Sequence, residues 1–423
     1  MSFNAAVLRF PLAFALLISG PSALAQGPVE NDNQYAEPVD ELVEEFEPIE
    51  ADPDGRYPMR VRGAFGKGLQ FRAVDDNFSV EMRARAQVQG NTVIPTAEDA
   101  SASANALIRR LRLVIGGQVF RREVTYYLQL GFAPRDLESD LLIPVRDAFV
   151  TWHASRVLNI RLGQMKVPFD RQRVTSSSAQ QMVDRSSVTA ELNLDRDLGL
   201  QIYSTDLLDD DGVLSYQLGV FGGNGRNRLS REPGFLATAR LQVAPFGRFD
   251  DFVESDLQRS PQPKLALAAA VGYNHRTYRT QSTIGDVLED ESLNYAHLAA
   301  DVLFKFRGFS FLAQWMFRQN TERVGVDGSP APAVSGARDA MGFFGQGGYL
   351  FYENVEVSAR VGHIEPTTEH RGDGLQRLTE IGGGLSWFAI AHDLKVQADY
   401  FVFLDGEAAT PRHQLRLQTQ VYF

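Results

Sequence analysis

From residue 78 to the last residue, the chain alternates apolar and polar residues with a period of two, in one short segment after another. In residues 78–89, FSVEMRARAQVQ, every even position is apolar and every odd position is polar. A β-strand points successive side chains to opposite faces of its sheet, so such a segment has one apolar and one strongly polar face. The same alternation recurs in VTYYLQLGF, VLSYQLGVF, NVEVSARVG and the closing RHQLRLQTQVYF. It predicts an all-β chain.

The connections between these segments are of two lengths. Sixteen strands are predicted, beginning near residues 78, 108, 124, 145, 157, 198, 213, 235, 264, 293, 309, 340, 355, 377, 393 and 412. Short connections such as 307–308 mostly alternate with long ones such as 91–107 and 165–197. Two exceptions, 206–212 and 246–263, fall where short connections are expected. A transmembrane barrel sorts its connections in this way, because its turns face the periplasm and its loops face the outside.

An even number of strands brings both ends of a barrel to the same side of the membrane. Within a bilayer every backbone N–H and C=O has to be paired inside the protein, and strands achieve this only in a closed barrel. We therefore predict a 16-stranded antiparallel transmembrane β-barrel with short periplasmic turns and long external loops. The strand that ends at Phe423 is expected to pair with the first strand, with Leu417 facing lipid and Arg416 facing the lumen.

The N-terminal residues predict an export signal. Arg9 precedes an apolar run over residues 10–18, and small residues close the segment at 23–25. This pattern is typical of a secretory signal over residues 1–25 that is removed before folding. The alternative is an anchoring helix, but the apolar run is shorter than the ~20 residues that a span needs.

An acidic segment follows the signal. Residues 26–55 hold eleven acids and no Lys or Arg, whereas the rest of the chain after residue 25 is almost neutral, although the formal net charge is −11. Such a composition favours a disordered or short-helical periplasmic extension over residues 26–58. A docking helix for a periplasmic partner is the alternative. The barrel is then expected to occupy residues 59–423.

The composition argues against several classes of site. The chain has no cysteine, so it has neither disulfides nor a thiolate metal site. After residue 25 no stretch approaches ~18 consecutive apolar residues, the length of a spanning helix. The seven histidines are scattered without catalytic or metal-binding spacing, and GGNG and GQGG are not nucleotide-binding loops. We therefore expect no enzymatic activity, no cofactor, no metal and no nucleic-acid partner.

Several segments resemble the phosphate-selective porin O and P family. VRDAFVTW, IRLGQMKVPFD and TSSSAQQMVDRS follow one another over residues 145–186. RRLRLVIGG, FGGNGRN, LFKFRGFSFLAQW, VEVSARVGHIEP and RLQTQVYF extend the likeness to roughly residues 60–423. The resemblance implies a sixteen-stranded homotrimeric channel in the outer membrane of a Gram-negative bacterium, embedded in lipid and selective for anions. The acidic extension departs from the family's better-known members.

The polar positions of the strands are rich in arginine. The alternation points eight arginines into the lumen as candidates for lining the pore and binding anions: Arg83, Arg85, Arg110, Arg112, Arg161, Arg240, Arg360 and Arg416. With Lys395 they outnumber the inward acids, which are Glu81, Asp147, Asp301, Glu356, Glu380 and Asp399. A guanidinium binds phosphate or carboxylate through two parallel hydrogen bonds and stays charged. Four of these arginines lie on two adjacent strands and are expected to cluster. The alternative for each is a wall residue paired with a neighbouring acid.

The family resemblance places a constriction in the long connection at 165–197. Its candidates are Lys166, Arg171, Arg173 and Arg185, beside the three hydroxyls of Ser176–Ser178. Arg226 and Arg228 in GNGRNRLSR are candidates for drawing anions to the mouth. The alternative for both loops is a solvated surface of balanced charge.

The expected function is passive diffusion of small anions, phosphate or related ones, through an arginine-lined pore. A general or cation-tolerant porin of the same fold is the main alternative, because the inward acids are numerous. A barrel enzyme and a soluble exported β-protein are weaker alternatives. The sequence does not distinguish phosphate from pyrophosphate, sulfate or an organic anion.

Overall fold

The protein is described by a computed structural model over residues 59–96, 101–137, 142–208, 212–228, 233–326, 329–332, 335–368, 375–406 and 410–423. Among these residues, sixteen strands form one closed antiparallel ring, in which each strand pairs with its neighbours in chain order and β20 pairs with β3. The strands of this ring are β3 (Ser79–Pro95), β4 (Ser103–Val119), β5 (Arg121–Gly131), β6 (Val145–His153), β7 (Asn159–Lys166), β8 (Arg196–Tyr203), β9 (Leu214–Phe221), β10 (Phe235–Val243), β11 (Lys264–Thr277), β14 (Glu291–Phe306), β15 (Phe309–Gly325), β16 (Ala340–Phe351), β17 (Val355–Pro366), β18 (Leu378–Ile390), β19 (Leu394–Asp405) and β20 (Thr410–Tyr422).

The ring confirms the predicted barrel. All sixteen expected strands are present, and most begin within a few residues of their predicted starts. The largest difference is β4, which begins at Ser103, five residues before the predicted 108. It starts early because Ser103 still pairs with Val93 of β3, so the hairpin continues beyond its apolar part. The predicted signal and acidic extension lie outside the described residues.

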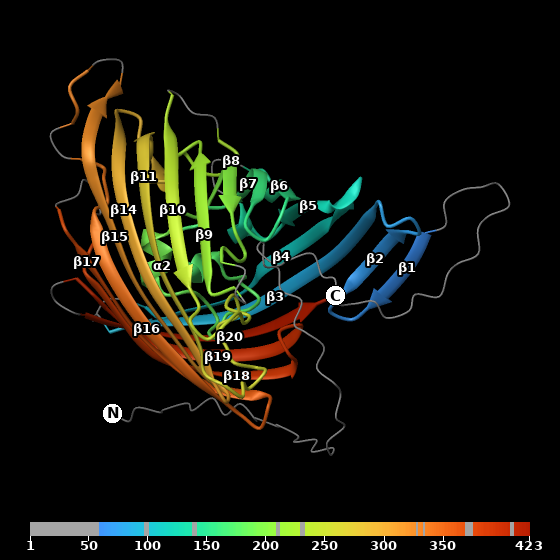
Figure 1. Cartoon of the computed structure of the whole chain (residues 1–423). Coiled ribbons are helices and arrows are strands. Elements are labelled where there is room, and N and C mark those ends of the chain that lie inside the picture. The colour runs from blue at the N-terminus through green and yellow to red at the C-terminus, as the bar shows by residue number, and fades with distance from the viewer. Residues whose placement is uncertain are drawn as a thin grey trace, which may run out of the picture.

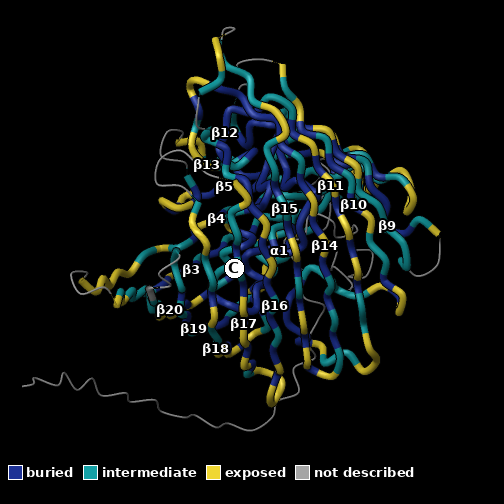
Figure 2. The backbone as a smooth tube through the Cα atoms, turned by 90° about the vertical axis from the view of Figure 1, so that its left-hand side faces the viewer, coloured by how far each residue is buried: buried dark blue, intermediate teal, exposed yellow. Residues whose placement is uncertain are grey.

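The wall of the barrel is apolar outside and polar inside. On β20, the side chains of Leu415 and Leu417 are 53% and 56% exposed, whereas Arg416 and Gln418 are buried. Figure 2 shows this alternation of buried and exposed positions along the strands. The period-two pattern of the sequence thus puts the polar side chains in the lumen, as predicted, because a strand alternates its faces.

Short turns gather on one side of the barrel, which we call the turn side, and long connections on the other, the loop side (Figure 1). The β14–β15 turn is Arg307 and Gly308, with positive φ of 49° and 87°. Such a two-residue turn matches the twist of the flanking strands. The described helices, α1 (Arg171–Val174), α2 (Ser187–Leu192) and the single-turn η1 (Pro134–Asp136), include none that is long and apolar enough to cross a membrane.

Two hairpins add to the sixteen strands. β1 (Met59–Ala64) and β2 (Gly68–Ala73) form a hairpin. β2 pairs with the first residues of β3, from Ser79 opposite Arg72 to Met82 opposite Leu69, a part of β3 that does not pair with β20. The region expected to be barrel from residue 59 therefore begins with an appendage beside β3 (Figure 1). On the loop side, β12 (Arg279–Gln281) and β13 (Ile284–Val287) form a small hairpin between β11 and β14.

The apolar core lies inside the barrel. Residues 167–195, which we call the inward loop, connect β7 to β8 and carry α1 and α2. Asp170 and Ser186 cap these helices by accepting from the backbone N–H groups of Arg173 and Thr189. Val188 and Leu192 of α2 pack in one cluster with Phe344 of β16 and other inward residues. This packing holds the inward loop across the lumen.

Candidate functional site

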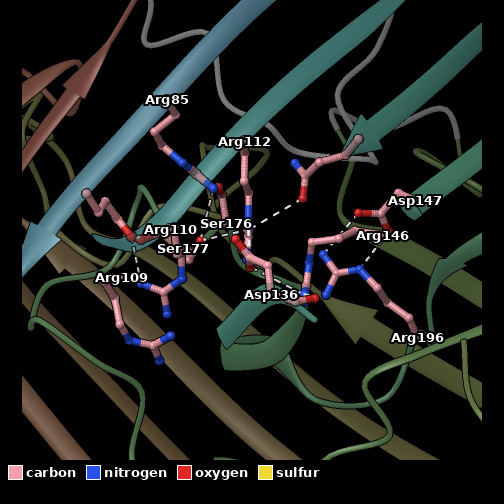
Figure 3. Close-up of polar contacts among 12 residues, drawn as sticks. Arg85, Arg109, Arg110, Arg112, Asp136, Arg146, Asp147, Ser176, Ser177 and Arg196 are labelled. Atoms are coloured by element: carbon pink, nitrogen blue, oxygen red, sulfur yellow. Dashed lines mark hydrogen bonds and ion pairs between the residues drawn. The ribbon is translucent and has the colours of Figure 1, made fainter. Parts of the chain in front are cut away.

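The inward loop presses its serines against an arginine-bearing wall. Arg85 of β3 donates to the hydroxyls of Ser176 and Ser177 over 3.3 and 3.1 Å. Arg112 of β4, directly opposite Arg85 in the sheet register, donates to Ser177 Oγ over 3.2 Å. Two guanidiniums therefore converge on one hydroxyl oxygen inside the barrel (Figure 3). From the sequence, these serines are expected beside Arg171, Arg173 and Arg185 of the loop, whereas the structure places Ser176 and Ser177 against arginines of the wall.

A strongly basic cavity of about 640 Å³ opens above these serines. We call it the arginine vestibule, and it is built mostly from β4 to β8 and the inward loop. Its lining contains the eleven basic residues Arg109, Arg110, Arg112, Arg135, Arg146, Lys166, Arg173, Arg185, Arg196, Arg226 and Arg279. Among the residues that the structure describes, three acids line it: Asp136, Asp195 and Asp286. Such an excess of fixed positive charge in a concave site concentrates anions.

Two β-bulges increase the number of charged side chains that face the vestibule. The β3–β4 register shifts between Gln87, opposite Arg110, and Val88, opposite Ile108, which leaves Arg109 as the extra residue. The β5–β6 register shifts between Gln129, opposite Asp147, and Leu130, opposite Val145, which leaves Arg146 extra. A bulge interrupts strict alternation. Arg109 and Arg110 therefore both face inward, as do Arg146 and Asp147.

Three aspartates partly neutralise the positive charge of the vestibule. Asp136 Oδ1 lies 2.7 Å from Arg112 Nη2 and 3.3 Å from Arg146 Nη1. Asp184 contacts Arg109 and Arg110 over 3.0 and 3.3 Å. Burial raises the pKa values of Asp136 and Asp184, but the effect of the surrounding arginines is larger and holds both pKa values well below their usual range. Asp195 is shared in the same way by Arg173 and Arg196.

Arg185 in the inward loop has no carboxylate in ion-pair contact among the described residues. Its guanidinium donates to the backbone carbonyls of Gln172 and Thr175 over 2.8 and 2.7 Å. Burial, and then the positive charge of Arg173, lower the pKa of Arg185 well below its usual range. Both effects disfavour the charged form, and an incoming anion would relieve both. The ammonium of Lys166 also donates to a backbone carbonyl of the inward loop, Val174 O, over 2.6 Å.

Other predicted pore arginines lie on what we call the paired wall, β10 to β20 with the part of the inward loop against it. There each of these predicted arginines contacts an acid. Arg240 lies 2.7 Å from Asp301, which also binds Arg171 at 2.6 Å. Arg360 lies 3.1 Å from Glu380. Arg416 makes a bidentate pair with Asp399 at 2.7 and 2.8 Å. These residues have the paired arrangement that was the alternative interpretation of each arginine.

The structure thus divides the predicted site residues. The vestibule brings together Arg110, Arg112, Lys166, Arg173, Arg185 and Arg226, with Arg85 on the serines below it. Arg171, Arg240, Arg360 and Arg416 belong to the paired wall. Arg83 lies over the ring of Tyr422, Arg161 stacks on Phe149 and donates to Thr151, and Arg228 is not among the cavity residues. The expected cluster of four arginines is therefore three, without Arg83.

Five basic residues of the vestibule were not among the predicted site residues. Arg109 and Arg146 were excluded by strict alternation, which bulges break without a clear signal in this sequence. Arg196 begins β8, two residues before the predicted start of that strand, and binds Asp147 through two hydrogen bonds of 2.9 and 3.0 Å. Arg135 lies in η1 and Arg279 in β12. Residues 279–287, RTQSTIGDV, contain the β-favouring residues Thr, Ile and Val, and they are the one signal that points to the β12–β13 hairpin.

Comparisons with known proteins bear on the fold and on the family. The model of the family "Phosphate-selective porin O and P" matches residues 78–282. The anion-selective porin from Comamonas acidovorans has a similar structure, with a TM-score of 0.54 and 10% identity over 82% of this chain and 100% of that chain. The outer membrane channel DcaP of Acinetobacter baumannii gives 0.53 and 12%, over 84% and 99%.

The trimer form of OmpT, an outer membrane protein of Vibrio cholerae, is also similar, with a TM-score of 0.50 and 10% identity over 82% of this chain and 100% of that chain. A search of curated protein sequences finds no match. The likeness to these solved structures supports the barrel fold along most of the chain.

Proposed function

We propose that this chain, whose residues 78–282 match the model of the phosphate-selective porin O and P family, is an outer-membrane channel through which small anions, phosphate or related ones, diffuse passively. The arginine vestibule is the entrance that collects anions from the loop side, and the arginine–serine contact below it is the narrow anion site. The channel needs no cofactor, and its role is passage rather than an enzymatic reaction.

The observation that carries this proposal is the convergence of Arg85 and Arg112 on Ser177 Oγ beneath a cavity with eleven basic and three acidic lining residues. A hydroxyl oxygen accepts hydrogen bonds from both guanidiniums, which is the role that an oxygen of phosphate or carboxylate takes when it binds arginine. The serine therefore occupies a place that suits an anion oxygen. An anion that displaces it gains charge-assisted hydrogen bonds, and the serine replaces it after it leaves.

The charges of the vestibule also suit conduction rather than capture. Asp136, Asp184 and Asp195 are each shared by at least two arginines, so the positive charge is spread over many sites. An ion crosses a pore quickly when several moderate sites follow one another and no single site holds it tightly. The mixed lining therefore supports a pathway of successive weak contacts.

A less selective porin is the second candidate, and the paired wall favours it. Arg240, Arg360 and Arg416 are each in contact with an inward carboxylate, so that side of the lumen is nearly neutral. Neutral walls admit cations as readily as anions. The balance between this wall and the vestibule decides the selectivity.

We also propose a homotrimer in the outer membrane, exported by the N-terminal signal. The trimer form of the structurally similar OmpT supports this assembly. Exposed apolar side chains on the outer wall, such as Leu417, Val361 and Leu385, suit contact with lipid or with a second barrel.

The decisive experiment is the reversal potential of single channels in a KCl gradient, repeated with phosphate as a competitor. The proposal expects a potential on the anion side and a chloride current that phosphate reduces. A potential on the cation side would contradict anion selectivity. An anion-sided potential without any effect of phosphate would leave an anion channel with a different preferred permeant.

A further inference from the structure

Residues 244–263 connect β10 to β11 on the turn side, yet they fold back into the lumen. We call them the turn-side segment. Val253, Glu254, Ser255 and Asp256 are all less than 5% exposed. The backbone N–H of Glu254 donates to Ala179 O of the inward loop over 3.1 Å. This connection, predicted as a long exception among the short ones, thus meets, inside the barrel, a loop that enters from the opposite side.

Contacts with the barrel hold the turn-side segment in this position. Asp251 lies 2.9 Å from Arg171 of the inward loop. Asp256 accepts from the backbone N–H of Gly308 over 2.7 Å, and from that of Ser260 over 3.1 Å. Ser255 Oγ donates to Glu356 of β17 over 2.6 Å. These contacts therefore fix the segment inside the lumen.

The carboxylate of Glu254 is bound by amides of the inward loop and of β16. Gln181 N donates to it over 2.8 Å, Gln346 Nε2 over 2.9 Å and Gln172 Nε2 over 3.1 Å. No cation of the described chain lies within ion-pair distance of Glu254. Asp251 and Asp301, in contrast, each contact an arginine. Three neutral donors stabilise a carboxylate without cancelling its charge.

Glu254 is close to the floor of the vestibule along the inward loop. Its partners Ala179 and Gln181 follow Ser176–Ser178, which contact Arg85 and Arg112. Its negative charge acts on Arg185, a lining residue of the vestibule, and on Lys395. An anion that passes the serines therefore approaches, on its way to the turn side, a carboxylate that has no ion-pair partner among the described residues.

We propose that Glu254 is a selectivity-determining residue of the channel, whose carboxylate weakens anion binding at the vestibule floor. This inference rests on the proposed anion pathway. The repulsion lowers anion selectivity below the value that the vestibule alone would produce, and it speeds release of anions that the arginines have collected.

The test replaces the charge and keeps the shape. Glu254→Gln is compared with Glu254→Asp, which keeps the charge, and with Glu353→Gln on the exposed β16–β17 turn as the matched control. Channels are reconstituted in planar bilayers, and the reversal potential in a KCl gradient and the block of chloride current by phosphate are measured. We expect E254Q to raise the chloride-to-potassium permeability ratio about two- to fivefold and to strengthen phosphate block. We expect the other two variants to stay near the wild type.

An unchanged permeability ratio in E254Q, or an equal change in E353Q, would overturn the inference. Because the new side chain in E254Q brings an amide N–H₂ toward three donors, Glu254→Ala provides a second neutral variant if E254Q does not assemble, and the same shift is expected from it. The proposed function has a separate test in the same recordings. A wild-type channel on the cation side would contradict that function, whereas a shift toward anions in E254Q would still support the role of Glu254.

Discussion

Two arginines of the same loop illustrate how the two sides of the lumen differ. Arg171 faces the paired wall, where burial lowers its pKa but Asp301 and Asp251 raise it above the ordinary value. Arg185 faces the vestibule, where burial and Arg173 lower its pKa well below that value. The residue type is the same, and the neighbours differ. Arginine in a pore thus stabilises the fold where carboxylates surround it, and it is available to anions where they do not.

The largest expected effect is a difference in the free energy of unfolding between variants of these two arginines. Arg171→Ala leaves Asp251 without its ion-pair partner and Asp301 with only Arg240, and removing one member of a buried pair costs about 3–5 kcal/mol. Arg185→Ala removes hydrogen bonds to two carbonyls and relieves repulsion by Arg173, so about 1 kcal/mol is expected. Urea unfolding of the refolded barrels measures both. Equal losses would contradict the division into two regions, and Arg171→Ala with Asp251→Asn is expected to recover part of the loss.

Asp170 provides a pH-dependent test on the side of the loop that faces the paired wall. Burial raises its pKa to about 6, and its Oδ2 has no hydrogen-bond partner within the described structure. A carboxyl whose pKa is higher in the folded than in the unfolded state binds more protons when folded. Its contribution to stability therefore falls as the pH rises from about 4 to 6.

Asp170→Asn keeps the cap on the backbone N–H of Arg173 and removes the ionisation. We expect this variant to be more stable than the wild type at pH 7 by up to about 3 kcal/mol, with no difference near pH 3. Unfolding curves across this pH range test the expectation. A constant difference at all pH values would instead indicate a packing effect.

Removing the arginine pair at the serines tests the vestibule itself. Arg85→Ala with Arg112→Ala is expected to lower the chloride-to-potassium permeability ratio about tenfold, equivalent to about 1.4 kcal/mol. The matched control, Arg360→Gln with Glu380→Gln, removes an ion pair of the paired wall without changing the net charge. Reversal potentials of the two double variants sharpen the comparison. The division of the lumen into the vestibule and the paired wall would be wrong if the control shifted selectivity as much as the vestibule variant.

The smallest expected effect is a response of the wild-type channel to salt. In the proposed pathway, the vestibule attracts anions partly over distances comparable with the screening length, which falls from ~10 Å at 0.1 M to ~3 Å at 1 M salt. We expect anion selectivity to decrease severalfold over this range, measured with KCl gradients of constant ratio. Selectivity that does not change with salt would indicate that the contacts at Ser176 and Ser177, rather than the field of the vestibule, decide it.

Local order along the chain was enough to predict the barrel. Strict alternation on β20 indicates which side chains face the lumen, and the spacing of turn and loop connections indicates the even number of strands. The inward position of Arg85, Arg110 and Arg112 follows from the same pattern. These features depend only on neighbouring residues and on the bilayer, so they can be derived without the tertiary structure.

The pairing of charges depends on long-range contacts. Arg416 and Arg112 have the same place in the alternation, yet Arg416 meets Asp399 on the next strand, whereas Arg112 meets Asp136 and the serines of the inward loop. Two bulges turn Arg109 and Arg146 inward, and the turn-side segment brings Glu254 to Ala179, which is 75 residues earlier in the chain.

Alternation therefore determined by itself that the lumen is polar and contains arginines. Only the tertiary structure decided which arginines are neutralised and which face a cavity, because the charge on a buried group is set by whatever the fold places within a few ångströms of it.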